Sequence, residues 1–336
     1  MSSRRSAQPE LFLTWIEHQR TRNLASRLQL SLIELTTTRQ GLRRYVELLP
    51  RTLRTLWTNH PRVLIVQTPS QVLAVLAVLL RPIIGYRLIL DAHNEAVEPY
   101  LHRTRLVRAL THWLIRQADR VIVSNRQLAE IVQRQRGHPL ILPDALPTPP
   151  EVTRFHLREA RTVAVISTYA GDEPIMEIME AARLIGPNTH FFVTGNDAKC
   201  PESVRQRIPD NVVLTGFLSE VDYWSLLASC DVIVDLSTMD NCLVCGAYEA
   251  VALGKPLLLS NNAASVELFS SFAEFTDNTS ADIAASIIRL QSESNDFAQT
   301  AAMRRDIFET NWRRQADELK KYIMNNTTTE KYSGIA

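Results

Sequence analysis

The residues of this chain with the clearest potential for chemistry lie in one stretch, residues 237–260. The stretch follows a short apolar run at 231–236, whose length and β-branched residues are typical of a buried strand. A helix over residues 247–253 is predicted next, because a Gly-x-Pro stop ends it, and another short strand follows. Glu249 lies on that helix among small and apolar residues. Its carboxylate is placed to accept hydrogen bonds from ribose hydroxyls, as the acidic residue of a dinucleotide-binding fold does.

The elements around Glu249 form a strand–loop–helix–strand unit, and such units bind ligands at the loop and at the helix start. The whole unit resembles the donor-site signature of the retaining family-4 glycosyltransferases, in which a Glu, seven residues and a second Glu precede a small-apolar helix ending in Gly-x-Pro. Glu249 matches the second Glu, whereas Asn241 occupies the first position, with Asp240 beside it. The resemblance implies that Glu249 contacts the ribose and that Asp240 or Asn241 contacts hydroxyls of the donor sugar.

A second polar group follows the strand predicted at residues 87–90, in the sequence D-A-H-N-E. A parallel sheet presents such groups at its carboxyl edge, where ligands bind. In the resembling family a His at this place faces the donor sugar, and His93 matches it, with Asn94 beside it on the acceptor side. A later phrase, A-D-R-V-I-V-S-N, is another hallmark of these transferases. The resemblance covers residues 85–320 well and residues 10–80 only by strand pattern.

The first half of the chain is strongly basic. Residues 1–150 hold 21 arginines, no lysine and ten acidic residues, a formal charge of +11, whereas the remainder carries −10. This half suits an anionic partner, such as a phospholipid surface, a lipid diphosphate or a phosphorylated glycan. Arginines of a helix predicted at 41–58 could contact anionic headgroups, although an exposed, solvated face is favoured. Nucleic acid is not expected, because no recognised nucleic-acid motif accompanies the charge.

Polar residues follow the first predicted strand, residues 11–15. The loop after such a strand lies at the carboxyl edge of an α/β sheet, where substrates bind. Its side chains are therefore candidates for contacts with an acceptor or a phosphate, and a merely solvated loop is an equal alternative. The candidates are Glu17, His18, Arg20 and Arg22.

Several segments of the second half are predicted to hold a nucleotide sugar. After a strand at 162–167, a loop leads to a helix that starts at Pro174, and the backbone amides from Tyr169 to Glu173 are expected to hold a diphosphate. The resembling family adds an Arg and a Lys to this loop. Both are missing here, so the alternative is a base elsewhere, such as Lys255. The predicted donor-binding residues are Tyr169, Gly171, Asp172, Glu173, Gly195, Asn196, Phe217, Cys242, Leu243, Val244 and Lys255.

Metal and membrane-spanning functions are not expected. Four cysteines include a C-x-x-C at 242–245, but no second pair or His pair completes a zinc site, so free thiols in a reducing cytosol are predicted. No D-x-D motif ends a strand, and no cofactor besides the nucleotide-sugar co-substrate is predicted. The longest apolar run, 72–80, is about half the length of a membrane span, and no signal peptide is recognised. A cytoplasmic protein is expected, with peripheral membrane association left open.

At 336 residues, the chain is expected to form two domains. The resemblance implies the GT-B architecture, which is α/β with two Rossmann-like, doubly wound parallel-sheet domains facing a cleft. Residues 1–150 would form the acceptor-side domain and residues 151–305 the nucleotide-sugar domain. A helix at 306–324 would pack back on the first domain, and 325–336 would be a tail.

The implied activity is transfer of a sugar from a UDP- or GDP-linked donor to a glycan, lipid-linked or other acceptor. Retention of configuration and a place in polysaccharide or glycoconjugate biosynthesis are implied as well. The residues expected at the reacting sugar and the donor are His93, Asp240, Asn241 and Glu249. Three alternatives stay open: a catalytically impaired partner protein of the same fold, a sugar-nucleotide 2-epimerase, and an Arg-rich nucleic-acid binder.

Overall fold

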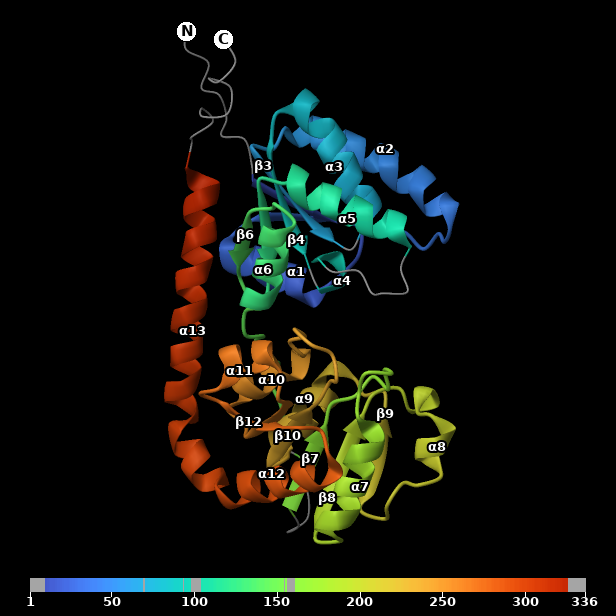
Figure 1. Ribbon diagram of the computed structural model, residues 1–336, viewed down its shortest axis with the longest axis vertical. Coiled ribbons are helices and arrows are strands. Elements are labelled where there is room, and N and C mark those ends of the chain that lie inside the picture. The colour runs from blue at the N-terminus through green and yellow to red at the C-terminus, as the bar shows by residue number, and fades with distance from the viewer. Residues whose placement is uncertain are drawn as a thin grey trace. The chain divides into compact units, whose positions relative to one another are not determined.

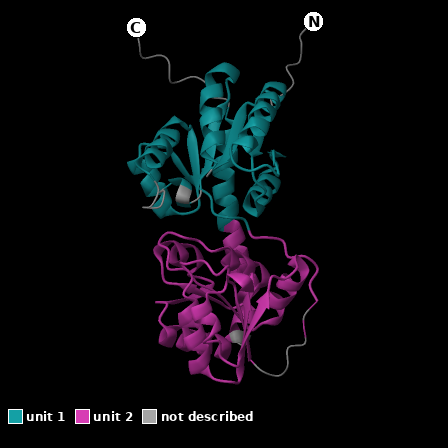
Figure 2. Cartoon of the chain, turned by 90° about the vertical axis from the view of Figure 1, so that its right-hand side faces the viewer, with its two compact units in different colours: residues 1–145, 311–336 teal, residues 146–310 magenta. Residues whose placement is uncertain are grey.

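The computed structural model describes residues 10–68, 70–92, 94–97, 104–153, 155 and 161–325. The chain divides into two compact units (Figure 2). Unit 1 comprises Met1–Ala145 and Asn311–Ala336, and unit 2 comprises Leu146–Thr310. The long last helix, α13 (Ser294–Met324), contributes its first part to unit 2 and its last part to unit 1.

Unit 1 is built on a parallel sheet of six strands in the order β2-β1-β3-β4-β5-β6. Its central strands are buried on both faces, which explains why they read as continuous apolar runs rather than as alternating ones. The strands are β1 (Glu10–Thr14), β2 (Ser31–Glu34), β3 (Val63–Thr68), β4 (Arg87–Ala92), β5 (Arg120–Val123) and β6 (Pro139–Ile141).

The helices of unit 1 cover both faces of this sheet (Figure 1). Residues of α2, α3, α5 and α6 share one apolar core, whereas residues of α1 and the last part of α13 share the other. The helices are α1 (Gln19–Leu28), α2 (Leu42–Asn59), α3 (Gln71–Ile84), α4 (Asn94–Val97), α5 (Arg105–Gln117) and α6 (Arg126–Arg134).

Unit 2 repeats this plan, with a parallel six-stranded sheet in the order β12-β11-β10-β7-β8-β9. Its strands are β7 (Arg161–Val165), β8 (Thr189–Thr194), β9 (Val212–Gly216), β10 (Val232–Asp235), β11 (Leu257–Ser260) and β12 (Ala273–Thr276). Its helices are α7 (Ile175–Ile185), η1 (Asp197–Lys199), α8 (Glu202–Arg205), α9 (Glu220–Ser229), α10 (Cys245–Leu253), α11 (Ala263–Phe269) and α12 (Ser280–Ser292).

The strand order places the functional loops. In unit 2 the chain moves outward from β7 to β9 and then returns to β10 on the other side of β7, so the order reverses between β7 and β10. Ligands of open α/β sheets bind at the carboxyl ends of the strands at such a reversal. The loops after β7 and β10 are therefore the first place to look for a site. The α/β class and the doubly wound parallel sheets predicted from the sequence are confirmed.

Local sequence signals set the helix ends. The side chains of Thr104, Asn125, Ser219, Asn262 and Thr279 each accept a hydrogen bond from a backbone N–H in the first turn of the following helix. The last helix, by contrast, is longer than the 306–324 predicted from sequence, because it already begins at Ser294. Its extra turns bury apolar side chains in the core of unit 2. Among the described helices, none is long and apolar enough to cross a membrane.

Candidate nucleotide-sugar site

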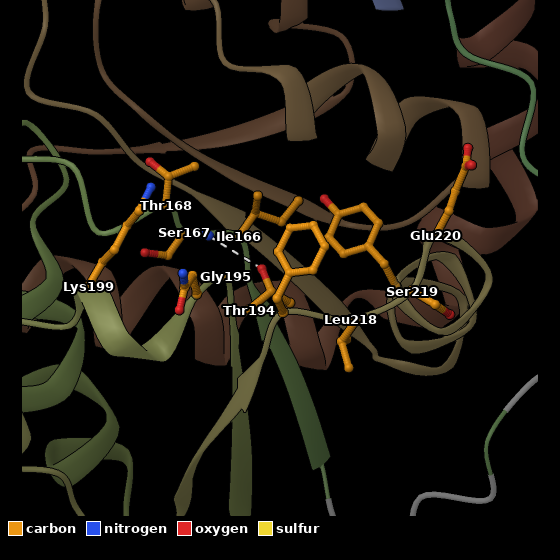
Figure 3. Close-up of a pocket in the computed structure, with 12 residues that line it drawn as sticks. Ile166, Ser167, Thr168, Thr194, Gly195, Lys199, Leu218, Ser219 and Glu220 are labelled. Atoms are coloured by element: carbon orange, nitrogen blue, oxygen red, sulfur yellow. Dashed lines mark hydrogen bonds between the residues drawn. The ribbon is translucent and has the colours of Figure 1, made fainter. Parts of the chain in front are cut away.

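A pocket of about 650 Å³ opens at the carboxyl ends of β7, β8 and β9 in unit 2 (Figure 3). Three residues that line it were predicted from the sequence: Gly195, Asn196 and Phe217. The other lining residues were not, and they are Ile166, Ser167, Thr168, Thr194, Lys199, Leu218, Ser219, Glu220 and Tyr223. The pocket is large enough for a small-molecule ligand and lies at the edge where α/β sheets bind one.

Gly195 lets two loops of the pocket meet. Its φ of +105° is strained for any residue with a side chain. A Cβ at this position would lie 2.2 Å from the carbonyl oxygen of Ser167, which follows β7. The turn after β8 and the loop after β7 can therefore approach each other only because residue 195 is glycine.

Tyr223 connects the pocket to Glu249. The Tyr223 hydroxyl, in the pocket wall, donates a hydrogen bond of 2.5 Å to Oε2 of Glu249 on α10. Burial raises the pKa of Glu249 to about 7, against the opposing effect of this hydrogen bond. Burial, followed by the charge of Glu249, raises the pKa of Tyr223 as well. The carboxylate of Glu249 is thus one hydrogen bond away from Tyr223, a residue that lines the pocket.

Asp235 is a buried carboxylate that was predicted from the sequence only as part of a strand. It ends β10, and its Oδ2 accepts a hydrogen bond of 2.9 Å from the backbone N–H of Gly246 at the start of α10. Burial, then the charge of Glu249, raises its pKa to about 8. Gly246 is required here, because a Cβ would lie 2.5 Å from the same carboxylate oxygen. Asp235 thus fixes the start of the helix that carries Glu249.

The loop predicted to hold a diphosphate is occupied by its own carboxylate. Glu173 accepts hydrogen bonds from the backbone N–H of Thr168 at 2.9 Å and of Tyr169 at 2.9 Å. The hydroxyls of Ser167 and Thr168 donate to it at 2.6 and 2.7 Å. The N–H of Glu173 itself donates to the carbonyl of Ala170 at 3.1 Å. The backbone N–H groups of Thr168 and Tyr169 thus point at one acceptor, the carboxylate of Glu173, and only Tyr169 of these two was in the predicted range 169–173.

The other acidic residue of this loop, Asp172, connects it to the loop after β10. Oδ2 of Asp172 accepts a 2.6 Å hydrogen bond from Ser237, and its carbonyl accepts one of 2.7 Å from the N–H of Thr238. The loops after β7 and β10 are thereby joined. Gly171 next to it is exposed, with open space where a Cβ would stand. These contacts give Asp172 a structural reason to be acidic.

The loop between β10 and α10 holds the remaining predicted donor residues. Asp240 is exposed, and Asn241 is partly exposed with a left-handed φ of +60°. The Cys242 carbonyl accepts a 3.4 Å hydrogen bond from Asn262, and Val244 is the N-cap of α10. Leu243 packs against the core beside α10. The structure brings this loop to the same sheet edge as the pocket, yet none of its residues lines the pocket.

Lys255 lies at the wrong edge of the sheet for a phosphate. It stands between the end of α10 and the start of β11, and its Nζ donates a 2.7 Å hydrogen bond to the carbonyl of Cys230, just before β10. Both positions are at the amino ends of the strands, whereas the pocket is at the carboxyl ends. The prediction that Lys255 supplies the missing base is therefore wrong. Of the twelve lining residues, Lys199 is the basic one, and it lies on the Thr168 side of the pocket (Figure 3).

In unit 1, the structure corrects the prediction for Arg20. Its side chain is only 2% exposed, pairs with Asp91 at 3.1 Å and with Asp144, and donates to the carbonyl of Leu142 at 3.1 Å. Arg20 thus ties the ends of β4 and β6 together and does not face an acceptor. Its polarity suggested a solvated loop, but two distant carboxylates make burial possible.

Other acceptor-side candidates remain at the surface of unit 1. Arg22 is half-exposed and binds Glu34 through two nitrogens, with Glu17 at 2.8 Å from the same guanidinium. His18, the N-cap of α1, is exposed on one side. Partial desolvation, then the charge of Arg20, lowers its pKa. Asn94 begins α4 and is partly exposed, while His93 lies outside the described residues.

The same edge of unit 1 holds buried polar side chains. Thr14 Oγ1 donates to Oε1 of Gln67 at 2.8 Å, and Thr68 Oγ1 donates to the carbonyl of Asp91 at 2.9 Å. Nε2 of Gln67 and Oδ2 of Asp91 have no hydrogen-bond partner within the described part of the chain. The described residues also contain no group of three or more His, Cys, Asp or Glu that could hold a metal ion. None of the four cysteines, all of them within the described residues, forms a disulfide bond.

Comparisons with known proteins agree with this architecture. Residues 12–142 match a family model described as "Glycosyl transferase 4-like domain". The chain resembles HepE of Anabaena, solved in complex with UDP-glucose, with a TM-score of 0.67 and 13% identity over 93% of this chain and 100% of that one. A comparison with curated protein sequences found no match.

Two further solved structures share the fold. Sucrose-phosphate synthase from Thermosynechococcus elongatus has a TM-score of 0.68 and 16% identity, over 91% of this chain and 84% of that one. A putative UDP-N-acetylglucosamine 2-epimerase from Listeria monocytogenes has a TM-score of 0.63 and 13% identity, over 97% of this chain and 100% of that one. At these identities the likeness establishes the fold. The chain has the GT-B fold, with two Rossmann-like α/β units each built on a six-stranded parallel sheet.

Proposed function

We propose that the protein is a glycosyltransferase that uses a nucleotide-sugar donor, with UDP-glucose as the first donor to test. The observation that carries the proposal is the pocket of unit 2, whose lining residue Tyr223 donates a hydrogen bond to the partly buried carboxylate of Glu249. The family model matched by residues 12–142 and the UDP-glucose complex of HepE support it. Unit 2 would hold the donor, and unit 1 would bind the acceptor, a glycan or a lipid-linked sugar.

The nucleoside would occupy the pocket. The ring of Phe217, which is 87% exposed, offers a surface on which a base can stack. Ribose hydroxyls would donate to the carboxylate of Glu249, next to the Tyr223 hydroxyl. Because such hydrogen bonds favour the ionised carboxylate, donor binding would lower the pKa of Glu249 from about 7. Nucleotide affinity should therefore increase as the pH rises from 6 to 8.

The diphosphate would bind beside the pocket, at the backbone N–H groups of Thr168 and Tyr169 and the ammonium of Lys199. The carboxylate of Glu173 must leave those amides first. Transfer with retention would proceed on one face of the sugar without an enzyme nucleophile, so that catalysis rests on positioning and on stabilising the departing diphosphate. Asp240 or Asn241 would contact the donor sugar, with His93 near the reacting carbon. Glu17, His18 and Asn94 would contact the acceptor, and the reaction would serve polysaccharide or glycoconjugate biosynthesis.

A thermal-shift panel of UDP, GDP, ADP, TDP and CMP tests the nucleotide site. A ligand at ~100 times its dissociation constant should stabilise the folded protein by about 2.7 kcal/mol. Phe217→Ala should reduce the shift, whereas Val213→Ala, an exposed residue of β9 outside the pocket, should not. The matching UDP- or GDP-sugar is then incubated with and without glycan acceptors. Sugar transfer supports the proposal, and conversion of the donor to its 2-epimer without acceptor would identify an epimerase instead.

One observation favours a second candidate, a catalytically impaired partner of the same fold. The carboxylate of Glu173 accepts hydrogen bonds from the backbone N–H groups that a diphosphate would need. Among the residues that line the pocket, Lys199 is the one basic residue. Such a protein would bind nucleotides weakly. If no nucleotide in the panel shifts the melting temperature, and Glu173→Ala does not restore a shift, this second candidate replaces the first.

A further inference from the structure

Helix α2 exposes an apolar stripe to solvent. Leu42 is 82% exposed, Val46 72% and Trp57 63%, and Leu53 is exposed on the same side of the helix. At about 100° of turn per residue, these four positions fall within about 60° of one another. The buried residues of α2, such as Leu48 and Leu56, face the core instead. The stripe adjoins this buried face, since Leu56 is about 40° from Leu42 around the helix, but its four side chains stay exposed to solvent.

Two other helices of the same core, α3 and α5, also expose apolar side chains. The described part of unit 1 exposes eleven large apolar side chains, and nine of them lie on α2, α3 and α5. These helices pack on the same face of the sheet, in one shared core (Figure 1). The contributions of α3 and α5 are Val72, Leu79, Ile83, Leu106 and Trp113. A row of exposed apolar side chains such as the stripe of α2 is the kind of surface that binds a partner.

The same three helices are strongly basic. Together they carry eight arginines and a single acidic residue, Glu47. On α2, Arg43 and Arg54 stand next to the apolar stripe, about 40–60° further round the helix than Trp57. Glu47 is neutralised by ion pairs with Arg39 and Arg51. The surface thus combines exposed Leu, Ile, Val and Trp with a cationic border.

We propose that this surface, α2 with the exposed sides of α3 and α5, docks unit 1 on an anionic lipid membrane. Apolar side chains that enter the interfacial region, flanked by arginines that meet anionic headgroups, are the pattern of a peripheral membrane helix. The charge beside the stripe favours a membrane as the occupant, because two copies of this chain would bring the positive charges of Arg43 and Arg54 against each other. A nucleic acid would use the arginines but would leave the apolar stripe in water.

Vesicle co-sedimentation with the full chain tests the proposal. Vesicles of phosphatidylcholine alone are compared with vesicles containing 30% phosphatidylglycerol, each at low and high salt. We expect binding to the anionic vesicles, weakened by salt because screening reduces the arginine contribution. The variant Leu42→Gln, Val46→Gln, Trp57→Gln should bind at least tenfold more weakly. The variant Arg43→Gln, Arg54→Gln should lose affinity mainly at low salt.

Matched controls lie on unit 2. Leu184→Gln, Ile288→Gln, Met303→Gln removes three exposed apolar residues there, and Arg161→Gln, Arg207→Gln removes two exposed arginines. Both controls should bind vesicles as the unmodified chain does.

Equal binding to neutral and anionic vesicles, or unchanged binding by the apolar-stripe variant, would overturn the proposal. So would a dimer that the stripe substitutions convert to a monomer, since the stripe would then bind a second copy. Vesicle binding does not require a nucleotide, so this proposal and the proposed function fail independently.

Discussion

Glu249 is predicted to destabilise the folded protein at alkaline pH. Its side chain is partly buried and accepts a hydrogen bond from Tyr223, and desolvation raises its pKa from the ordinary 4.5 to about 7. A carboxyl group whose pKa is higher in the folded state binds its proton more tightly there. Between these two pKa values the folded chain therefore holds more protons than the unfolded chain, and stability falls as the pH rises.

Replacing Glu249 with Gln removes this penalty while keeping an oxygen that can accept from Tyr223. Each pH unit between the two pKa values corresponds to about 1.4 kcal/mol, so the full penalty above pH 7 is about 3 kcal/mol. At pH 5.5 only about 1 kcal/mol of it is present. Glu249→Gln should therefore gain about 2 kcal/mol of stability relative to the unmodified chain between pH 5.5 and pH 8.

Urea denaturation at a series of pH values, followed by circular dichroism, measures this difference. Glu177→Gln, which alters an exposed carboxylate on α7, is the matched control and should show little pH-dependent change. The same Glu249→Gln protein should bind UDP more weakly, since an amide is a poorer acceptor for ribose hydroxyls than a carboxylate. A stability difference that is constant from pH 5.5 to pH 8 would refute the reasoning, because Glu249 would then titrate alike in both states.

Three other substitutions test the site and its frame. Glu173→Ala should free the amides of Thr168 and Tyr169 and tighten UDP binding about tenfold by calorimetry; weaker binding would mean that the carboxylate only braces the loop. Arg20→Met leaves the carboxylates of Asp91 and Asp144 without their ion pairs and should lower the free energy of unfolding, measured by urea denaturation, by about 3–5 kcal/mol. The same substitution at the half-exposed Arg22 should lower it by less than about 1 kcal/mol. Equal losses for the two variants would contradict a structural role for Arg20. Gly195→Ala, with its Cβ 2.2 Å from a carbonyl oxygen at a φ of +105°, should lower stability by about 2 kcal/mol or more, whereas Gly171→Ala in open space should be near neutral in the same thermal assay.

Much of the architecture could be predicted from sequence because its signals are local. Apolar runs such as 63–66 and 231–236 are buried strands whichever residues cover them, and the helices between them force parallel pairing. Parallel strands then bring all their following loops to one edge. For that reason Gly195, Asn196 and Phe217 could be placed at the pocket without coordinates.

The tertiary structure decided which polar residues are available for binding. Arg20 is buried because Asp91 and Asp144, 71 and 124 residues away, neutralise it. Lys255 is turned to the opposite edge of the sheet by its place after a helix. The carboxylate of Glu173 accepts from the amides of its own loop, and the stripe of α2 stays exposed because the core of unit 1 covers only the adjoining side of that helix. Propensity and periodicity act over a few residues, whereas burial and pairing of charges depend on contacts that only the folded chain makes.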